Sequence, residues 1–328
     1  MNDPRWASID AFAEQNRDNI LRDITRLVAV PSVEGTPEPG APFGAGPRAA
    51  LDKALEIAAE LGLETYNAEG YIGWAQTGPI AGGQKYLATI THTDVVPEGN
   101  GWDADPYTVR VRDGWLLGRG VSDDKGPGIL CLYALKYLKD SGIELKYPVR
   151  ALLGTNEETN MHDVDYYAAH YPMPAFCFTP DAEFPVCNGE KGGFNGEIVS
   201  PRLENGVILD FQGGVARNAV PDRAFCTVRV APDAIECTEG VTKEAGENGA
   251  TVLRGQGKSG HAAMPAGTVN AISLLVDCLL HNHIGTEAEQ AYLRVLQKLH
   301  AATDGSAVGI AADDGLFDPL TIIGGTIG

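Results

Sequence analysis

Side chains able to bind metal follow three short segments that the sequence predicts to be strands, at the points where those strands would end. In sheets with parallel strands, the carboxyl ends of the strands share one edge, and functional groups collect there. We therefore expect these side chains to gather in one cleft. They are His92 and Asp94 after residues 86–90, Glu157 and Glu158 after residues 149–153, and Asp181 after residues 175–178.

His92 and Asp94 are two positions apart, a spacing that puts both side chains on the same side of an extended chain. A histidine that binds a metal needs its second ring nitrogen held by an acceptor, which is often a carboxylate. The pair is therefore suited to a metal site in which Asp94 supports His92. A surface loop with two chance polar residues is the alternative for this pair taken alone.

Asp123 lies in a polar, glycine-bearing loop at residues 118–126, directly before a helix predicted at 127–139. Glycine allows backbone conformations closed to other residues, and a carboxylate held there could bridge two cations. The alternative is that Asp123 or Asp124 caps the helix. For Asp181, which follows Pro180, the alternative is a turn residue.

The adjacent carboxylates of Glu157 and Glu158 repel each other unless a cation or a proton compensates them. Divided roles make chemical sense, with one binding metal and the other acting as general base toward a water. A solvated acidic turn is the alternative. Oxygen ligands combined with a histidine suit zinc, manganese or cobalt.

The composition excludes several classes of partner. The 328 residues carry a net charge of −19, whereas nucleic-acid binding needs clustered lysine and arginine. The sequence contains no run of about 18 apolar residues, so no membrane span is expected. The start of the chain has no apolar signal core. The six cysteines form no Cys-x-x-Cys pair and are expected to be buried thiols in the reducing cytoplasm.

The length favours two domains. Up to residue 190, strands alternate with helices at 8–30, 47–61 and 127–139, which predicts an α/β domain with a mostly parallel sheet. From residue 191 to 328, an α+β domain is expected. Its predicted strands lie at 196–198, 207–211, 225–230 and 251–253, and its predicted helices at 271–280 and 287–299.

Taken together, five segments resemble metallopeptidase family 20, which includes aminoacylases, desuccinylases and carboxypeptidases. The similarity is strongest to its branch of peptidase V-type dipeptidases, because SDDKGP and PDAEFP are typical of that branch. The segments are HTDVVP at 92–97, GWDADPY at 101–107, RGVSDDKGP at 119–127, Glu157–Glu158, and PDAEFP at 180–185.

The resemblance implies a zinc-exopeptidase-like catalytic domain, residues 1–190, with two divalent metal ions, zinc first and manganese or cobalt as alternatives. It implies that His92 and Asp181 bind one ion, that Glu158 binds the other and that Asp123 bridges them. By the same resemblance Asp94 orients His92, and Glu157 is the general base. A cis peptide bond between Asp123 and Asp124 is also expected.

Residues 191–328 resemble the inserted ferredoxin-like lid domain of the family. The segment GHAAMP at 260–265 matches a lid motif whose histidine, here His261, stabilises the oxyanion. The segment GGVARNAVP at 213–221 matches a second motif, in which Asn218 would contact the substrate.

One departure from the family concerns the end of the chain. The family returns to the catalytic domain after the lid and supplies a last metal-binding histidine, whereas this sequence stops at Gly328. We therefore expect an incomplete lid, an incomplete second metal site, and exposed apolar sheet surface that favours self-association.

The reaction expected from these observations is hydrolysis of the peptide bond of a dipeptide by a metal-activated water, with Glu157 as the base. The substrate class rests on the resemblance alone. Deacylation of an N-acyl amino acid by the same centre is one alternative. A truncated, metal-poor protein that only binds peptides is the other.

Overall fold

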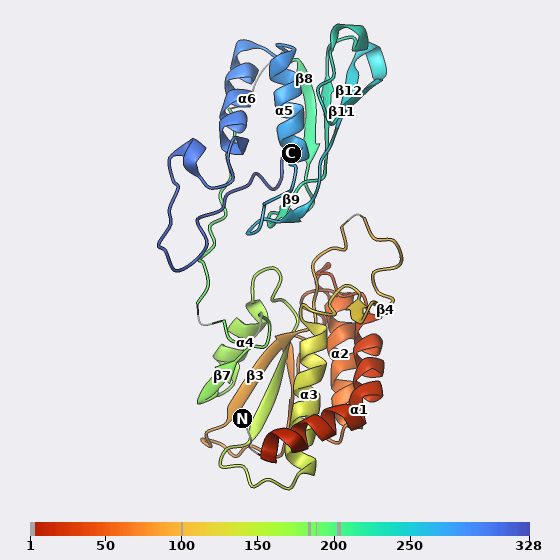
Figure 1. Ribbon diagram of the computed structural model, residues 1–328, viewed down its shortest axis with the longest axis vertical. Helices are drawn as coiled ribbons and strands as arrows, with labels where there is room; N and C mark the ends of the chain where they lie inside the picture. The colour runs from red at the N-terminus through yellow and green to blue at the C-terminus, as the bar shows by residue number, and fades with distance from the viewer. Residues whose placement is uncertain (1–3, 100, 183–184, 188, 202–204) are drawn as a thin grey trace. The chain divides into compact units, whose positions relative to one another are not determined.

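The computed structural model describes residues 4–99, 101–182, 185–187, 189–201 and 205–328 (Figure 1). The chain divides into two compact units, residues 1–187 and 188–328. The division falls three residues before the boundary expected from the sequence, and each unit is described by itself.

The first unit contains a five-stranded sheet in the order β1-β2-β6-β3-β7. β3 pairs in parallel with both β6 and β7, whereas β1–β2 and β2–β6 are antiparallel. The α/β class is as predicted, but the sheet is mixed rather than mostly parallel. The short turn from β1 to β2 accounts for the first of the two antiparallel pairs, because a tight connection permits only antiparallel pairing. The strands are β1 (Glu64–Ala68), β2 (Ile72–Gln76), β3 (Leu87–His92), β6 (Val149–Gly154) and β7 (Phe176–Phe178).

Both faces of this sheet are covered at its central strands, whereas the edge strand β7 is exposed. Along β6, Ala151 and Leu153 belong to the core under α1, α2 and α3, whereas Leu152 belongs to a second core with Tyr167 of α4 (Figure 1). Successive side chains of a strand point to opposite faces, so β6 is buried on both sides. The helices are α1 (Pro4–Val28), α2 (Ala45–Glu60), α3 (Lys125–Asp140) and α4 (His162–His170), and a small hairpin joins β4 (Arg110–Arg112) to β5 (Trp115–Leu117).

The second unit contains an antiparallel sheet in the order β11-β12-β10-β8, and α5 packs on it (Figure 1). A short pair, β9 with β13, stands apart from the sheet. The elements are β8 (Ile208–Gly213), β9 (Ala219–Val220), β10 (Arg223–Val228), β11 (Val241–Ala245), β12 (Thr251–Gln256), β13 (Gly260–His261), α5 (Ala271–His281) and α6 (Glu287–His300), with 3₁₀ helices at Pro232–Ala234, Glu247–Gly249 and Ser306–Val308.

Three expectations need correction. Residues 196–198 form no strand and are mostly exposed, so their short apolar pattern lacked a partner to pair with. In the second unit, the four strands of the main sheet come first along the chain and the two helices follow them. This order differs from the βαββαβ order of a ferredoxin-like domain. Cys177, Cys187 and Cys237 are exposed rather than buried. Among the described residues, no helix combines the length and apolar character needed to cross a membrane.

The loop before α3 depends on close backbone packing at Gly126. A Cβ atom there would overlap the carbonyl oxygen of Val121. Replacing glycine by alanine within a helix ordinarily stabilises it by about 1 kcal/mol. Here the overlap is with backbone rather than with a mobile side chain, so the steric cost outweighs that gain.

We therefore predict that Gly126→Ala destabilises the first unit by about 1–3 kcal/mol, the range typical of overpacked sites. The measurement is urea unfolding followed by tryptophan fluorescence, because all four tryptophans lie within residues 1–187.

Gly78→Ala is the matched control. A Cβ atom at Gly78 meets nothing within 4 Å, and surface changes of this kind usually stay within about 0.5 kcal/mol. Equal urea midpoints for the two variants would contradict the packing argument.

Candidate metal centre

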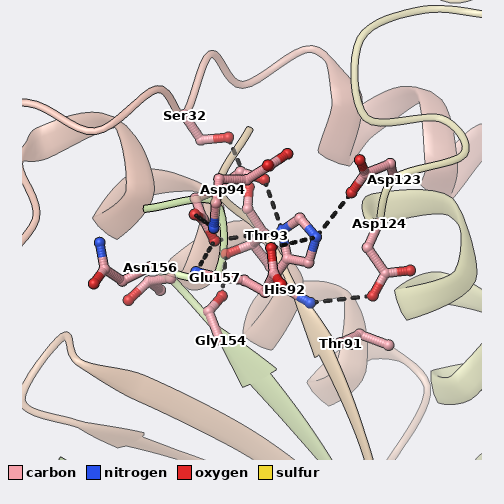
Figure 2. A network of polar contacts seen from close by, with 12 residues as sticks. Ser32, Thr91, His92, Thr93, Asp94, Asp123, Asp124, Gly154, Asn156 and Glu157 are labelled. Carbon is pink, nitrogen blue, oxygen red and sulfur yellow. Dashed lines mark hydrogen bonds and ion pairs between the residues drawn. The ribbon is translucent and has the colours of Figure 1, made fainter. Parts of the chain in front are cut away.

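His92, Asp123 and Asp181 come together in the first unit although they are far apart in sequence. His92 ends β3 and is 2% exposed, Asp123 lies in the loop before α3, and Asp181 follows β7. The His92 Nε2 atom is 2.9 Å from Asp123 Oδ1 (Figure 2) and 3.3 Å from Asp181 Oδ2. One ligand atom from each of the three residues lies within 4.8 Å of the others. The strand-end argument predicted that His92 and Asp181 would lie together, and the loop before α3 adds Asp123 to them.

The second ring nitrogen of His92 is held mainly by backbone. Its Nδ1 atom is 3.0 Å from the Asp94 carbonyl oxygen and 3.4 Å from Asp94 Oδ1. If Nδ1 carries the proton and donates it to the carbonyl, Nε2 presents a lone pair to the carboxylates of Asp123 and Asp181. That arrangement is repulsive unless a proton or a cation lies between them, and a divalent cation fits this donor set of one imidazole and several carboxylates.

The Asp94 carboxylate also has a task that the sequence did not predict. Its Oδ1 accepts the N–H of Glu157 at 3.3 Å, and its Oδ2 accepts the N–H of Glu158 at 3.1 Å. The backbone of the acidic pair is therefore hydrogen-bonded to Asp94, the residue that also supports His92; Figure 2 labels Asp94, Glu157 and His92. Spacing alone did not reveal this link, because Asp94 and Glu157 are 63 residues apart.

Glu157 and Glu158 lie at the margin of the three-residue group. Glu157 Oε2 is 3.9 Å from His92 Nε2, and its side chain is 42% exposed. Burial raises the pKa of Glu157. Burial and then the charge of Asp123 raise the pKa of Glu158 to about 7. The negative charge of Asp123 therefore acts on the Glu158 carboxyl group, although Glu158 does not belong to the group of His92, Asp123 and Asp181.

The electrostatics of the group show uncompensated negative charge. Burial opposes protonation of His92, but contacts with Asp123, Asp181 and Asp94 outweigh it and raise the pKa of the imidazole well above its usual range. Without a metal, the His92 imidazole thus keeps a proton that compensates the carboxylates. A cation would displace that proton, since metal ligands must be deprotonated.

Asp124 is buried next to the group and does not serve as a helix cap. It occupies the N-cap position of α3 without a side-chain capping bond. Its Oδ2 accepts the N–H of His92 at 3.2 Å (Figure 2), and within the described residues its buried Oδ1 has no hydrogen-bond partner. Burial and then the charge of Asp181 raise the pKa of Asp124 to about 8. The expected cis peptide bond between Asp123 and Asp124 is present.

The two predicted lid residues lie next to each other in the second unit. β9 and β13 pair so that Ala219 is opposite His261, and the Ala262 N–H donates to the Asn218 carbonyl oxygen at 2.8 Å. Both side chains are exposed. Their roles stay predictions. In the motif at 180–185, residues 183 and 184 lie outside the described residues.

Comparisons with known proteins define the class. The model of peptidase family M20/M25/M40 matches residues 88–254, a range that contains His92, Asp123, Asp181 and the acidic pair of Glu157 and Glu158. The chain belongs to this family, and it is thus a hydrolase that acts on peptide bonds.

The similar proteins include a Beta-Ala-Xaa dipeptidase of Lactobacillus delbrueckii subsp. lactis, 34% identical over 94% of this chain and 68% of that protein. A Bacillus subtilis protein with a provisional dipeptidase name is 33% identical over 95% of this chain and 70% of its own length. Among solved structures, human carnosine dipeptidase 1 shares 17% identity over 65% of this chain and 47% of that chain, with a TM-score of 0.45.

We predict that His92→Ala lowers the affinity for zinc by at least about 100-fold, since even outer-shell partners typically contribute 10- to 100-fold. Titration against a coloured chelator measures the affinity. His162→Ala is the control, because that side chain is 61% exposed and outside the group. Unchanged zinc affinity in His92→Ala would show that the metal binds elsewhere.

Stability without metal should depend on pH. Glu158 ionises near pH 7 in the folded chain and near 4.5 when unfolded, so the unfolded chain binds fewer protons between these values. The free energy of unfolding therefore falls as pH rises from about 5 to 7.5, and the raised pKa of His92 acts in the same direction above 6.5. Because Glu158 is half-buried, solvent screens part of the repulsion, and we expect a loss of about 1–2 kcal/mol.

Urea unfolding in the presence of a chelator, followed by tryptophan fluorescence, measures this loss. Saturating zinc should abolish or reverse it, because metal binding tightens as the ligands lose their protons. A metal-free chain that becomes more stable over this range would contradict the assignment.

Proposed function

We propose that the protein is a metal-dependent dipeptidase whose reaction centre is the group of His92, Asp123 and Asp181 with Glu157 beside it. The observation that carries the proposal is the buried Nε2 atom of His92, with three carboxylate oxygens between 2.9 and 3.9 Å away. The restriction to dipeptides is supported by the names of the two relatives that the chain covers by more than two thirds.

Zinc is the proposed metal, because an imidazole combined with carboxylates suits it, and manganese and cobalt suit the same donors. His92 and Asp181 would hold one ion, Asp123 would be shared, and Glu158 would bind a second ion. Bound metal supplies a Lewis acid that polarises the carbonyl and lowers the pKa of water.

The remaining chemistry falls to the side chains. Glu157 is exposed enough to meet a water and close enough to His92 to belong to the centre. Its carboxylate would take the proton from the attacking water and then deliver it to the leaving amine. In the second unit, His261 is proposed to stabilise the oxyanion and Asn218 to contact the substrate. We place the protein in the cytoplasm, where a reducing medium suits the exposed thiols of Cys177 and Cys237.

The test is hydrolysis by the chain loaded with zinc, manganese or cobalt, with the metal content measured in parallel. The substrates are β-Ala dipeptides, α-dipeptides, tripeptides, and N-acetyl and N-succinyl amino acids. Turnover of dipeptides alone supports the proposal. Turnover confined to the N-acyl amino acids would show a deacylase, and bound peptide without turnover would show a binding protein.

We predict that Glu157→Gln retains metal and lowers kcat by about 10²- to 10⁴-fold, the range of general acid–base catalysis. Glu158→Gln should instead lose metal, because an amide is a poorer ligand than a carboxylate. The control is Glu144→Gln, an exposed residue in the segment that precedes β6, at the end of that strand opposite to Glu157. If both variants lost metal equally, the division of roles between Glu157 and Glu158 would be wrong.

A further inference from the structure

Four consecutive peptide N–H groups directly after β6 donate to two buried carboxylates from other parts of the fold. Asp163 Oδ2 accepts the N–H of Thr155 at 2.7 Å and of Asn156 at 3.2 Å. Asp94 accepts the N–H groups of the next two residues, Glu157 and Glu158. The turn that presents the acidic pair is thus held by side chains rather than by a strand or a helix.

Asp163 belongs to this arrangement but has no role in the proposed reaction. It lies in the first turn of α4, is 1% exposed, and its Oδ1 accepts the N–H of Val164 at 2.8 Å. The two oxygens of one carboxylate therefore connect the start of α4 to the end of β6. A buried ionisable side chain is costly unless its hydrogen bonds are satisfied, and here three backbone groups satisfy it.

Gly154 shows that the chain makes room for this carboxylate. A Cβ atom on Gly154 would lie 2.5 Å from Asp163 Oδ2, closer than side chains tolerate. The Gly154 carbonyl oxygen also accepts the N–H and the hydroxyl of Thr93, each at 2.9 Å, beside His92. Gly154 thus lies between the Asp163 carboxylate and the end of β3.

The loop between the acidic pair and α4 is closed by Asn156. Its carbonyl oxygen accepts the N–H of Met161 at 2.8 Å, and its Oδ1 accepts the N–H of His162 at 3.2 Å. The backbone from residue 155 to residue 163 therefore forms one hydrogen-bonded unit, and Asp163 ties its two ends together.

We propose that Asp163 is a positioning residue that fixes the directions of the Glu157 and Glu158 side chains through the peptide groups of Thr155 and Asn156. The inference rests on the proposed roles of Glu157 and Glu158. The direction of a side chain follows from the backbone that carries it, and misplacement of a reacting group by about 1 Å can cost 10²-fold in rate.

Asp163→Asn tests the proposal with almost no change in shape. The amide nitrogen of asparagine only donates, so either the N–H groups of Thr155 and Asn156 or that of Val164 must lose its acceptor. In the full 328-residue chain we expect kcat to fall about 10- to 100-fold while KM changes less than about threefold. We also expect a weaker affinity for Co²⁺ and an altered visible absorption spectrum of the bound cobalt.

Gly154→Ala is the second variant, because it keeps every titratable side chain and displaces the Asp163 carboxylate by contact. It should reproduce the changes in kcat and in the cobalt spectrum. Asp165→Asn is the matched control, since Asp165 lies in the same turn of α4 but is 80% exposed. This control accounts for the loss of a negative charge near the helix start.

Several results would overturn the proposal. One is a folded Asp163→Asn chain, judged by circular dichroism, with wild-type kcat, cobalt affinity and cobalt spectrum. Another is an equal effect in Asp165→Asn, and a third is lower stability with an unchanged spectrum. If neither Asp163→Asn nor Gly154→Ala folds, Asp163 serves the fold rather than the acidic pair, which also overturns it.

These readouts keep the two proposals apart. If the wild-type chain hydrolyses no dipeptide, the proposed function fails. The cobalt affinity and spectrum of the variants still decide whether Asp163 positions the acidic pair.

Discussion

The structure of the first unit depends on one electrostatic constraint, which is the burial of the His92 imidazole against several carboxylates. Asp123, Asp181 and Glu157 all face its Nε2 atom, and Asp94 lies at its Nδ1 atom. Carboxylates gathered in this way repel one another and destabilise a folded chain unless a proton or a cation compensates them. The site is therefore costly to the metal-free fold and favourable to a metal, which is the usual balance between stability and function.

The strand pairs and the hydrophobic cores around the site stabilise the fold against that cost. The parallel pairs β3–β6 and β3–β7 bring three strand ends to one edge, and cores on both faces hold the sheet in place. At that edge, backbone N–H groups donate to Asp94, Asp124 and Asp163. Three buried carboxylates thereby organise the backbone, while Asp123 and Asp181 face the His92 Nε2 atom. Buried peptide N–H groups need acceptors, and these three carboxylates supply them.

Close packing of backbone limits which residues can occupy the loops of the site. Gly126 approaches the Val121 carbonyl group, and Gly154 leaves room for the Asp163 carboxylate. Asp124 is buried and accepts the N–H of His92. A change at Gly126 would act on the neighbouring acidic side chains through the backbone, whereas a Cβ atom on Gly154 would contact the Asp163 carboxylate itself.

The sequence by itself determined the α/β class, the strands before His92 and Glu157, and the meeting of the strand ends that carry His92 and Asp181. These follow from local patterns, because apolar runs set the strands and parallel strands share an edge. Only the tertiary structure decided that the sheet is mixed, that residues 196–198 form no strand, and that Asp94 holds the acidic pair while Asp163 holds the preceding turn. Those features depend on which segments meet in space, and hydrogen bonds between residues 63 positions apart leave no periodic trace in the chain.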